Sequence, residues 1–175
     1  MGKWKELETE ITITIDGSFD ELIKIGQQDG FQGLSGLAFQ LKKSVERAAS
    51  KAAKDLAAHN RSLQQRLIAD ISVHPYASGM LASSIIEQQK GEYQYLIGTR
   101  INHIYPMAVE YGRREIRPKN AKALFFYALS GEPVWAKHVG PAEPRPFVEP
   151  AYKETERISL KVTDTIIDKE LSAFK

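Results

Sequence analysis

The chain has 175 residues, of which 42% are hydrophobic and 26% are charged, and its formal net charge is +2. This length and composition predict a single globular domain, and the weak net charge does not by itself indicate a nucleic-acid partner. The sequence contains no cysteine, which excludes disulfides and cysteine-based zinc sites. Its charged beginning predicts no signal peptide, and no apolar run approaches the ~18 residues of a membrane span.

The first predicted elements are a strand and a short helix. Residues 8–15 alternate isoleucine with threonine or glutamate, which is typical of a half-buried strand. Ser18 and Glu21 have the spacing of a capping box, so we expect a helix over residues 19–28. The pair Asp29-Gly30 should end it.

A long helix comes next. Apolar residues recur at steps of three and four along one stripe, which is typical of an amphipathic helix. They are Leu34, Leu37, Leu41, Val45, Ala48, Ala52 and Leu56, with Leu63, Leu67 and Ile71 as a continuation. The opposite face carries Lys43, Arg47, Lys51 and Lys54. The alanines predict close approach of a neighbour, and His74-Pro75 predicts the end of the helix.

The second half predicts strands and then a helix. Residues 93–99 indicate a strand, and part of 101–112 does too, although Pro106 places it at an edge or a bulge or marks a change to helix. Residues 123–129 and 133–139 flank a short turn and predict a hairpin. The proline-rich segment 141–150 should be extended, and a helix should start near Phe147 or Pro150.

This order predicts an α+β domain in which an antiparallel sheet packs against the long helix, with a C-terminal helix added. We expect one domain over residues 1–175. Its core should include Leu41, Val45, Ile97 and either Phe125 or Phe126.

No motif for catalysis, a cofactor or a metal ion is present. We therefore predict that the chain is not an enzyme and binds neither a cofactor nor a metal ion. A metal site assembled from separate histidines, or an unrecognised hydrolase site, remains an alternative. Residues 40–66 hold seven Lys or Arg against two acids. This face is either simply solvated or contacts the DNA phosphate backbone without reading sequence, because no aromatic residues are interleaved for base stacking.

Three sequence elements then follow in a fixed order. HPYASGMLASSI (74–85) contains Gly79, Leu81 and Ser84; IYPMAVEYGRR (104–114) contains Glu110, Tyr111 and Gly112; and PRPFVEPAY (144–152) contains Pro146, Phe147 and Pro150. With a long helix before them and a helix after, residues 34–170 resemble the tail-component family of long-tailed bacteriophages and prophages, also called the head–tail joining or tail-completion family. Ala77-Ser78 departs from the aspartate–threonine common there, and residues 1–30 lie outside the pattern.

The resemblance implies a structural virion protein that acts at the tail end or head–tail junction. Its partners would be other neck or tail proteins, or its own copies in a ring, with no membrane involved. It would be found in the virion, and in the host cytoplasm during assembly.

In this interpretation, residues 110–112 end a core strand, where the glycine permits a turn or a close backbone approach and the tyrosine anchors it. The aromatic residues Phe125, Tyr127 and Trp135 should face one another across the hairpin or pack under the helix. The candidate contact surface is an exposed loop and the hairpin tip, with a simple solvated loop as the alternative. Its residues are Arg113, Arg114, Glu115, Arg117, Lys119, Ser130, Gly131, Glu132 and Pro133.

Overall fold

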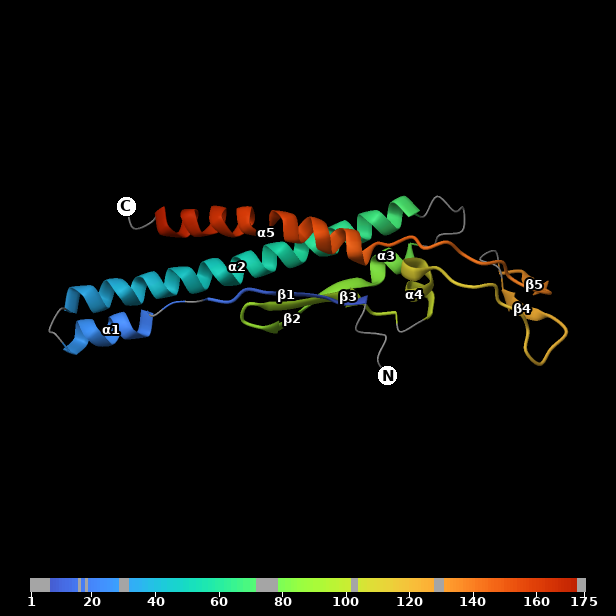
Figure 1. The fold of residues 1–175 in the computed structure, drawn as a ribbon, viewed down its shortest axis with the longest axis horizontal. Helices are drawn as coiled ribbons and strands as arrows, with labels where there is room; N and C mark the ends of the chain where they lie inside the picture. Colours follow the sequence, from blue (N-terminus) through green and yellow to red (C-terminus); the bar gives the residue numbers. More distant parts are fainter. Residues whose placement is uncertain are drawn as a thin grey trace.

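The computed structural model describes residues 7–15, 17, 19–28, 32–71, 79–101, 104–127 and 131–172. They form an elongated α+β domain in which one long helix carries a second helix on one side and a small sheet on the other (Figure 1). Several expectations concern residues outside these ranges: Ser18, the Asp29-Gly30 turn, His74-Pro75, Ala77-Ser78 and Ser130.

The long helix α2 (Gln32–Ile71) has 40 residues and is therefore about 60 Å long at 1.5 Å per residue. Its predicted apolar stripe is buried in the middle of the helix, at Ala48, Ala52 and Leu56. Near its start, Leu34 and Leu37 are 46% and 55% exposed. This end extends beyond the sheet and the C-terminal helix, and α1 (Phe19–Gln28), whose predicted bounds are confirmed, lies beside it (Figure 1).

Helix α5 (Val148–Leu171) packs along the alanine-rich middle of α2. Ala48 and Ala52 form one apolar cluster with Ile166 of α5, which confirms that small residues allow a close neighbour. Farther along, Asn60 Nδ2 donates a 3.0 Å hydrogen bond to Thr155 Oγ1 of α5. Because Asn60 is fully buried, sliding one helix past the other would leave its amide unpaired, so this bond fixes their alignment.

The main sheet is antiparallel, with the strand order β1 (Thr9–Thr12), β3 (Gln94–Thr99), β2 (Ile85–Gly91). The core lies between this sheet and α2, where Ala53 and Ala57 meet Ile85 and Ile97. Ile97 is fully buried as predicted, whereas Leu41 and Val45 are only half-buried. The fold class predicted from the sequence is confirmed.

Two short helices flank the main sheet. The first, α3 (Met80–Ser84), leads directly into β2, and neither of these two elements was predicted. The second, α4 (Ile104–Tyr111), corrects the expectation of a strand over part of residues 101–112 and confirms the alternative that Pro106 marks a change to helix. Pro106 lies in the first turn of α4, where a proline is tolerated because its missing N–H would have no helical partner. Glu110 and Tyr111 therefore end a helix and not a core strand.

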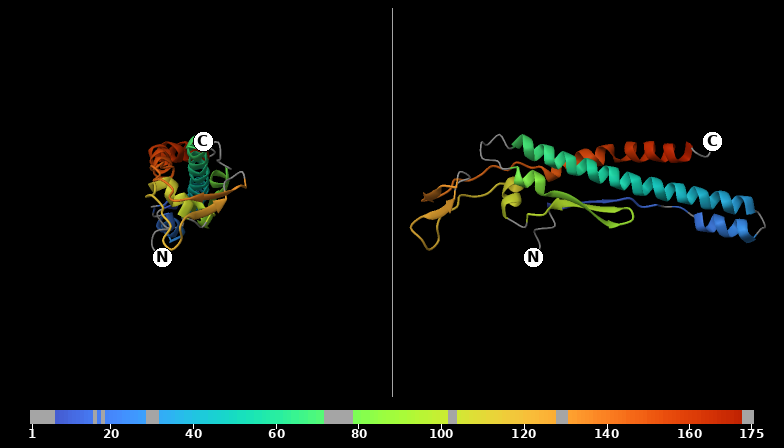
Figure 2. Two further views of the ribbon diagram at one scale, coloured as in Figure 1. Left: turned by 90° about the vertical axis from the view of Figure 1, so that its right-hand side faces the viewer. Right: turned by 180° about the vertical axis from the view of Figure 1, so that it is seen from behind.

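The predicted hairpin is present as β4 (Leu124–Tyr127) and β5 (Pro133–Ala136). It forms a separate two-stranded sheet at the end of the molecule opposite α1 (Figures 1 and 2). Phe125 and Phe126 are consequently 47% and 41% exposed. The prediction that one of them belongs to the core is wrong, because the hairpin lies beyond the reach of α2 and the main sheet.

Candidate functional site

The chain between α4 and α5, residues 112–146, extends away from the body as a narrow two-chain ribbon that ends in the β4–β5 hairpin (Figure 1). We call this segment the arm. Arg113 and Ala142 exchange two backbone hydrogen bonds of 2.9 Å, and Ile116 and Val139 exchange another two of 2.9 Å. Residues 113–116 are thus paired with the returning chain, and only 117–119 keep the loop character expected for 113–119.

Glu110 holds the base of the arm through its buried carboxylate. Its Oε2 accepts hydrogen bonds from the backbone N–H of Phe147 (2.7 Å) and Val148 (3.0 Å), and Oε1 accepts one from Glu149 (3.3 Å). These N–H groups open α5, and Phe147 at the N-cap position has no side-chain oxygen to cap them. Glu110 therefore caps a helix that starts 38 residues later, with its negative charge at the positive end of the helix dipole.

Gly112 ends α4 at a position that only glycine can occupy. Its φ is +72°, and a Cβ placed there would lie 2.6 Å from the carbonyl oxygen of Ala142 and 2.9 Å from Pro144 Cδ. The expected close backbone approach is confirmed. Next to it, the backbone N–H of Arg145 donates to the carbonyl of Val109 (2.7 Å), so both chains of the arm are fixed where they leave the body.

The first of the three sequence elements reaches the same region. Gly79 adopts φ +68° before α3, and Ser84 Oγ lies 2.7 Å from Thr99 Oγ1 of β3. Leu81 is buried in the same apolar cluster as Phe147. Residues from all three elements therefore surround the base of the arm, with Pro150 half-buried in the first turn of α5 and Pro146 exposed before it.

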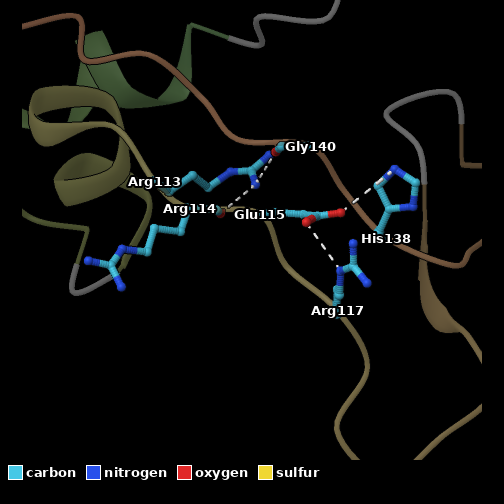
Figure 3. Close-up of polar contacts among 6 residues, drawn as sticks. All are labelled: Arg113, Arg114, Glu115, Arg117, His138 and Gly140. Atoms are coloured by element: carbon cyan, nitrogen blue, oxygen red, sulfur yellow. Dashed lines mark hydrogen bonds and ion pairs between the residues drawn. The ribbon is translucent and has the colours of Figure 1, made fainter.

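Some charged side chains of the arm contact other residues of the arm, and others point away from it. Arg113 donates to the carbonyl of Gly140 at 2.7 Å, and Glu115 lies between Arg117 (3.1 Å) and His138 (3.8 Å) (Figure 3). Arg113 and His138 thus make contacts between the two chains of the arm, whereas Arg117 pairs with Glu115 on its own chain. Arg114 points away from this group in Figure 3.

The residues best placed for a partner are those on the outside of the arm. Arg114 and Lys119 are exposed, as are Gly131, Glu132 and Pro133 beside the turn of the hairpin.

The hairpin presents aromatic surface to solvent. The rings of Phe125 and Trp135 face each other across β4 and β5 with centroids 4.6 Å apart, which confirms the expected cross-strand pair. Trp135 nevertheless remains 71% exposed. The side chain of Tyr127 lies outside the part of the chain that the structure describes.

A groove runs along the outer edge of β1, between that strand and α5. It consists of two adjoining hollows of about 340 and 320 Å³ that share Thr9, Glu10 and Tyr152. Five carboxylates line it and no Lys or Arg does; they belong to Glu8, Glu10, Glu110, Glu149 and Glu156. Sequence reasoning missed this groove, because nothing local indicates that residues near position 10 lie beside residues near 152.

Two other kinds of site were considered in the sequence, a metal site and the basic face of α2. Within those ranges, no group of three or more His, Asp or Glu residues is placed to hold a metal ion. On α2, Lys43, Lys51 and Lys54 are exposed as predicted, while Arg47 lies 3.7 Å from Glu170 of α5 and Lys42 lies 2.8 Å from Asp20 of α1. Part of the basic face therefore joins helices to one another.

None of the helices described is both long and apolar enough to span a lipid bilayer. A scan against protein-family models and searches of curated proteins and of solved structures found no match to this chain.

Proposed function

We propose that this protein is a structural component of a phage or prophage virion, acting at the tail end or head–tail junction by binding neighbouring proteins and not by catalysis. The observation that carries the proposal is the position of the three sequence elements. Their residues surround the base of a projecting arm, where Glu110 and Gly112 fix its direction. Such an arrangement suits a protein whose task is to hold a contact arm in a set orientation.

Two further features support binding over catalysis. The arm exposes a large aromatic side chain, Trp135, and aromatic residues are enriched in protein–protein interfaces. It also exposes Arg114 and Lys119, which are suited to steering an encounter with an acidic surface.

The test is a complementation assay for infectious particles, using the phage or prophage that encodes the chain. The variant reverses three exposed arm charges, Arg114→Glu, Lys119→Glu and Lys122→Glu. It spares Arg113, which bonds to the carbonyl of Gly140 in the returning chain, and Arg117, which pairs with Glu115. The expected result is a folded protein with an unchanged melting temperature and a particle yield reduced at least tenfold. A normal yield from this folded variant would refute the role of the arm.

The matched control reverses the same amount of charge on α2, through Lys43→Glu, Lys51→Glu and Lys54→Glu. These side chains form an exposed row, which favours contact with the DNA phosphate backbone as the second candidate function. If the control lowers particle yield and the arm variant does not, the second candidate is supported. Retention of DNA that falls steeply with added salt, and is lost in the control variant, would support it directly.

A further inference from the structure

We infer that the arm of one copy docks into the groove between β1 and α5 of a second copy, adding β4 as a fourth strand at the outer edge of β1. This inference rests on the proposed assembly role and names both the partner and the surface. It concerns a head-to-tail contact, in which each copy offers its arm and receives the arm of the next.

The first argument is the state of the hairpin. A two-stranded hairpin is at best marginally stable in water without a further strand or a helix to cover a face. In the described part of the chain, β4 and β5 pair only with each other, and Phe125, Phe126 and Trp135 remain 47%, 41% and 71% exposed. An exposed aromatic patch of this kind is typical of a surface that another protein chain covers.

The second argument is the shape of the groove. β1 is an edge strand, and no other described strand pairs with its outer side. Its register with β3 makes Thr9, Ile11 and Ile13 the residues bonded to β3, so the backbone groups of Glu10 and Thr12 face outward. An exposed edge with a groove alongside is the arrangement that accepts an added strand. Leu160 of α5 lines this groove and is 77% exposed.

The third argument is charge. The groove is lined by five glutamates and by no Lys or Arg. Glu110 caps α5 and Glu149 pairs with Lys153, which leaves Glu8, Glu10 and Glu156 as its acidic side chains for a partner. Residues 112–146 hold seven Lys or Arg against three Glu. The arm and the groove are therefore electrostatically complementary. Within one molecule the hairpin lies at the end of the long axis, away from β1 and α5 (Figure 1), whose residues line the groove. The complementary surfaces therefore meet between copies.

The choice of β4 follows from backbone chemistry. β5 begins with Pro133, which has no backbone N–H to donate, whereas β4 contains no proline. β1 and β4 each contain four residues, so β4 can pair along the whole of the exposed edge.

The experiment uses the absence of native cysteine, so that introduced thiols are the only ones to react. One population carries Ala123→Cys, just before β4. The second population is mass-tagged and carries Thr12→Cys, a nearly isosteric change at the edge of β1. After mixing and treatment with a short bismaleimide, the cross-linked heterodimer is quantified by gel electrophoresis, with Ala58→Cys on the exposed side of α2 as the matched control.

The expected result is a severalfold higher heterodimer yield with Thr12→Cys than with Ala58→Cys. This excess should disappear when the Ala123→Cys chain also carries the triple reversal of Arg114, Lys119 and Lys122. Equal yields at the two positions, at every protein concentration up to the solubility limit, would overturn the inference. A product joining two Ala123→Cys copies in place of the heterodimer would overturn it in favour of arm-to-arm pairing.

The cross-linking result and the particle yield distinguish failure of the docking inference from failure of the proposed function. A heterodimer excess together with normal particle yield from the arm reversal leaves the arm–groove contact standing and refutes the role of the arm in particle assembly. A lost particle yield with no heterodimer excess supports the virion role and refutes self-docking, so that the arm would bind a different neighbour.

Discussion

Glu110 Oε2 accepts a 2.7 Å hydrogen bond from the backbone N–H of Phe147, so the end of α4 caps the start of α5. The two residues belong to different elements of the sequence resemblance. Their contact joins the second and third of these elements at the base of the arm.

The cap predicts a large cost for Glu110→Ala. The change leaves the N–H groups of Phe147 and Val148 in a buried site without their acceptor, and each unsatisfied buried group costs ~1–3 kcal/mol. We expect the free energy of unfolding to fall by about 2–5 kcal/mol, measured by urea denaturation. Glu143→Ala, at an exposed position of the arm, is the control and should change stability by less than about 0.5 kcal/mol.

Gly112→Ala should destabilise the protein more than a change at another glycine of positive φ. A left-handed conformation costs a non-glycine residue ~1–2 kcal/mol, and at Gly112 the new methyl also meets the Ala142 carbonyl at 2.6 Å. Gly131 has φ +81°, and a methyl added there would meet nothing within 4 Å, so Gly131→Ala isolates the backbone strain. Equal losses of melting temperature for the two variants would contradict the steric argument.

Gly26→Ala and Gly36→Ala should change stability in opposite directions. A methyl at Gly26 of α1 would lie 2.8 Å from the backbone nitrogen of Ser35 in α2, and this crowding should cost ~1–3 kcal/mol. At Gly36 nothing lies within 4 Å, and replacing a helical glycine by alanine stabilises by ~0.5–1 kcal/mol. Thermal unfolding of both variants tests the pair, and a stabilising Gly26→Ala would show that α1 does not pack where the structure places it.

The Asp20–Lys42 ion pair predicts a pH dependence of the α1–α2 contact. The hydrogen bond and positive charge of Lys42 lower the pKa of Asp20 below its usual value of 3.8. Because the folded-state pKa is depressed, the stabilisation is present above pH 3.8 and is lost as pH falls through the lower, folded-state value. Asp20→Asn should therefore reduce stability slightly at neutral pH and have no effect in strong acid.

The control for this pH effect is the same substitution made together with Lys42→Met. Without its partner, Asp20→Asn should no longer alter stability at neutral pH. The measurement is urea denaturation of the four proteins of this double-mutant cycle at several pH values. An undiminished Asp20→Asn effect in the Lys42→Met protein would assign it to another contact.

Local sequence patterns predicted most of the helices and strands. Helices α2 and α5 and strand β1 show a repeat with one apolar face, α1 follows the spacing of a capping box, and the hairpin has a clear turn signal. Strand β2 was missed because its apolar residues are confined to Ile85 and Ile86. Helix α4 was not distinguished from a strand because it is only eight residues long, and its end is held by the backbone N–H of Arg145 from across the arm.

The candidate site was harder to predict than the fold. The charged segment and the hairpin were both identified, but the sequence does not show that Arg113 bonds across the arm to the carbonyl of Gly140 or that Arg117 pairs with Glu115. It also does not show that Phe125 and Phe126 lie outside the core, since an apolar strand has the same pattern whether or not another layer covers it. The groove depends on bringing β1 beside α5, which only the tertiary structure establishes.

The packing of α5 on α2 has a consequence for folding. Asn60 and Thr155 are 95 residues apart, so their contact requires closing a long loop, whereas the α1–α2 and β2–β3 pairs join neighbouring segments. The local pairs should therefore form early, and α5 should dock late. Until then the alanine face of α2 is uncovered in the partly folded chain, and this is the stage at which we expect aggregation to compete with folding.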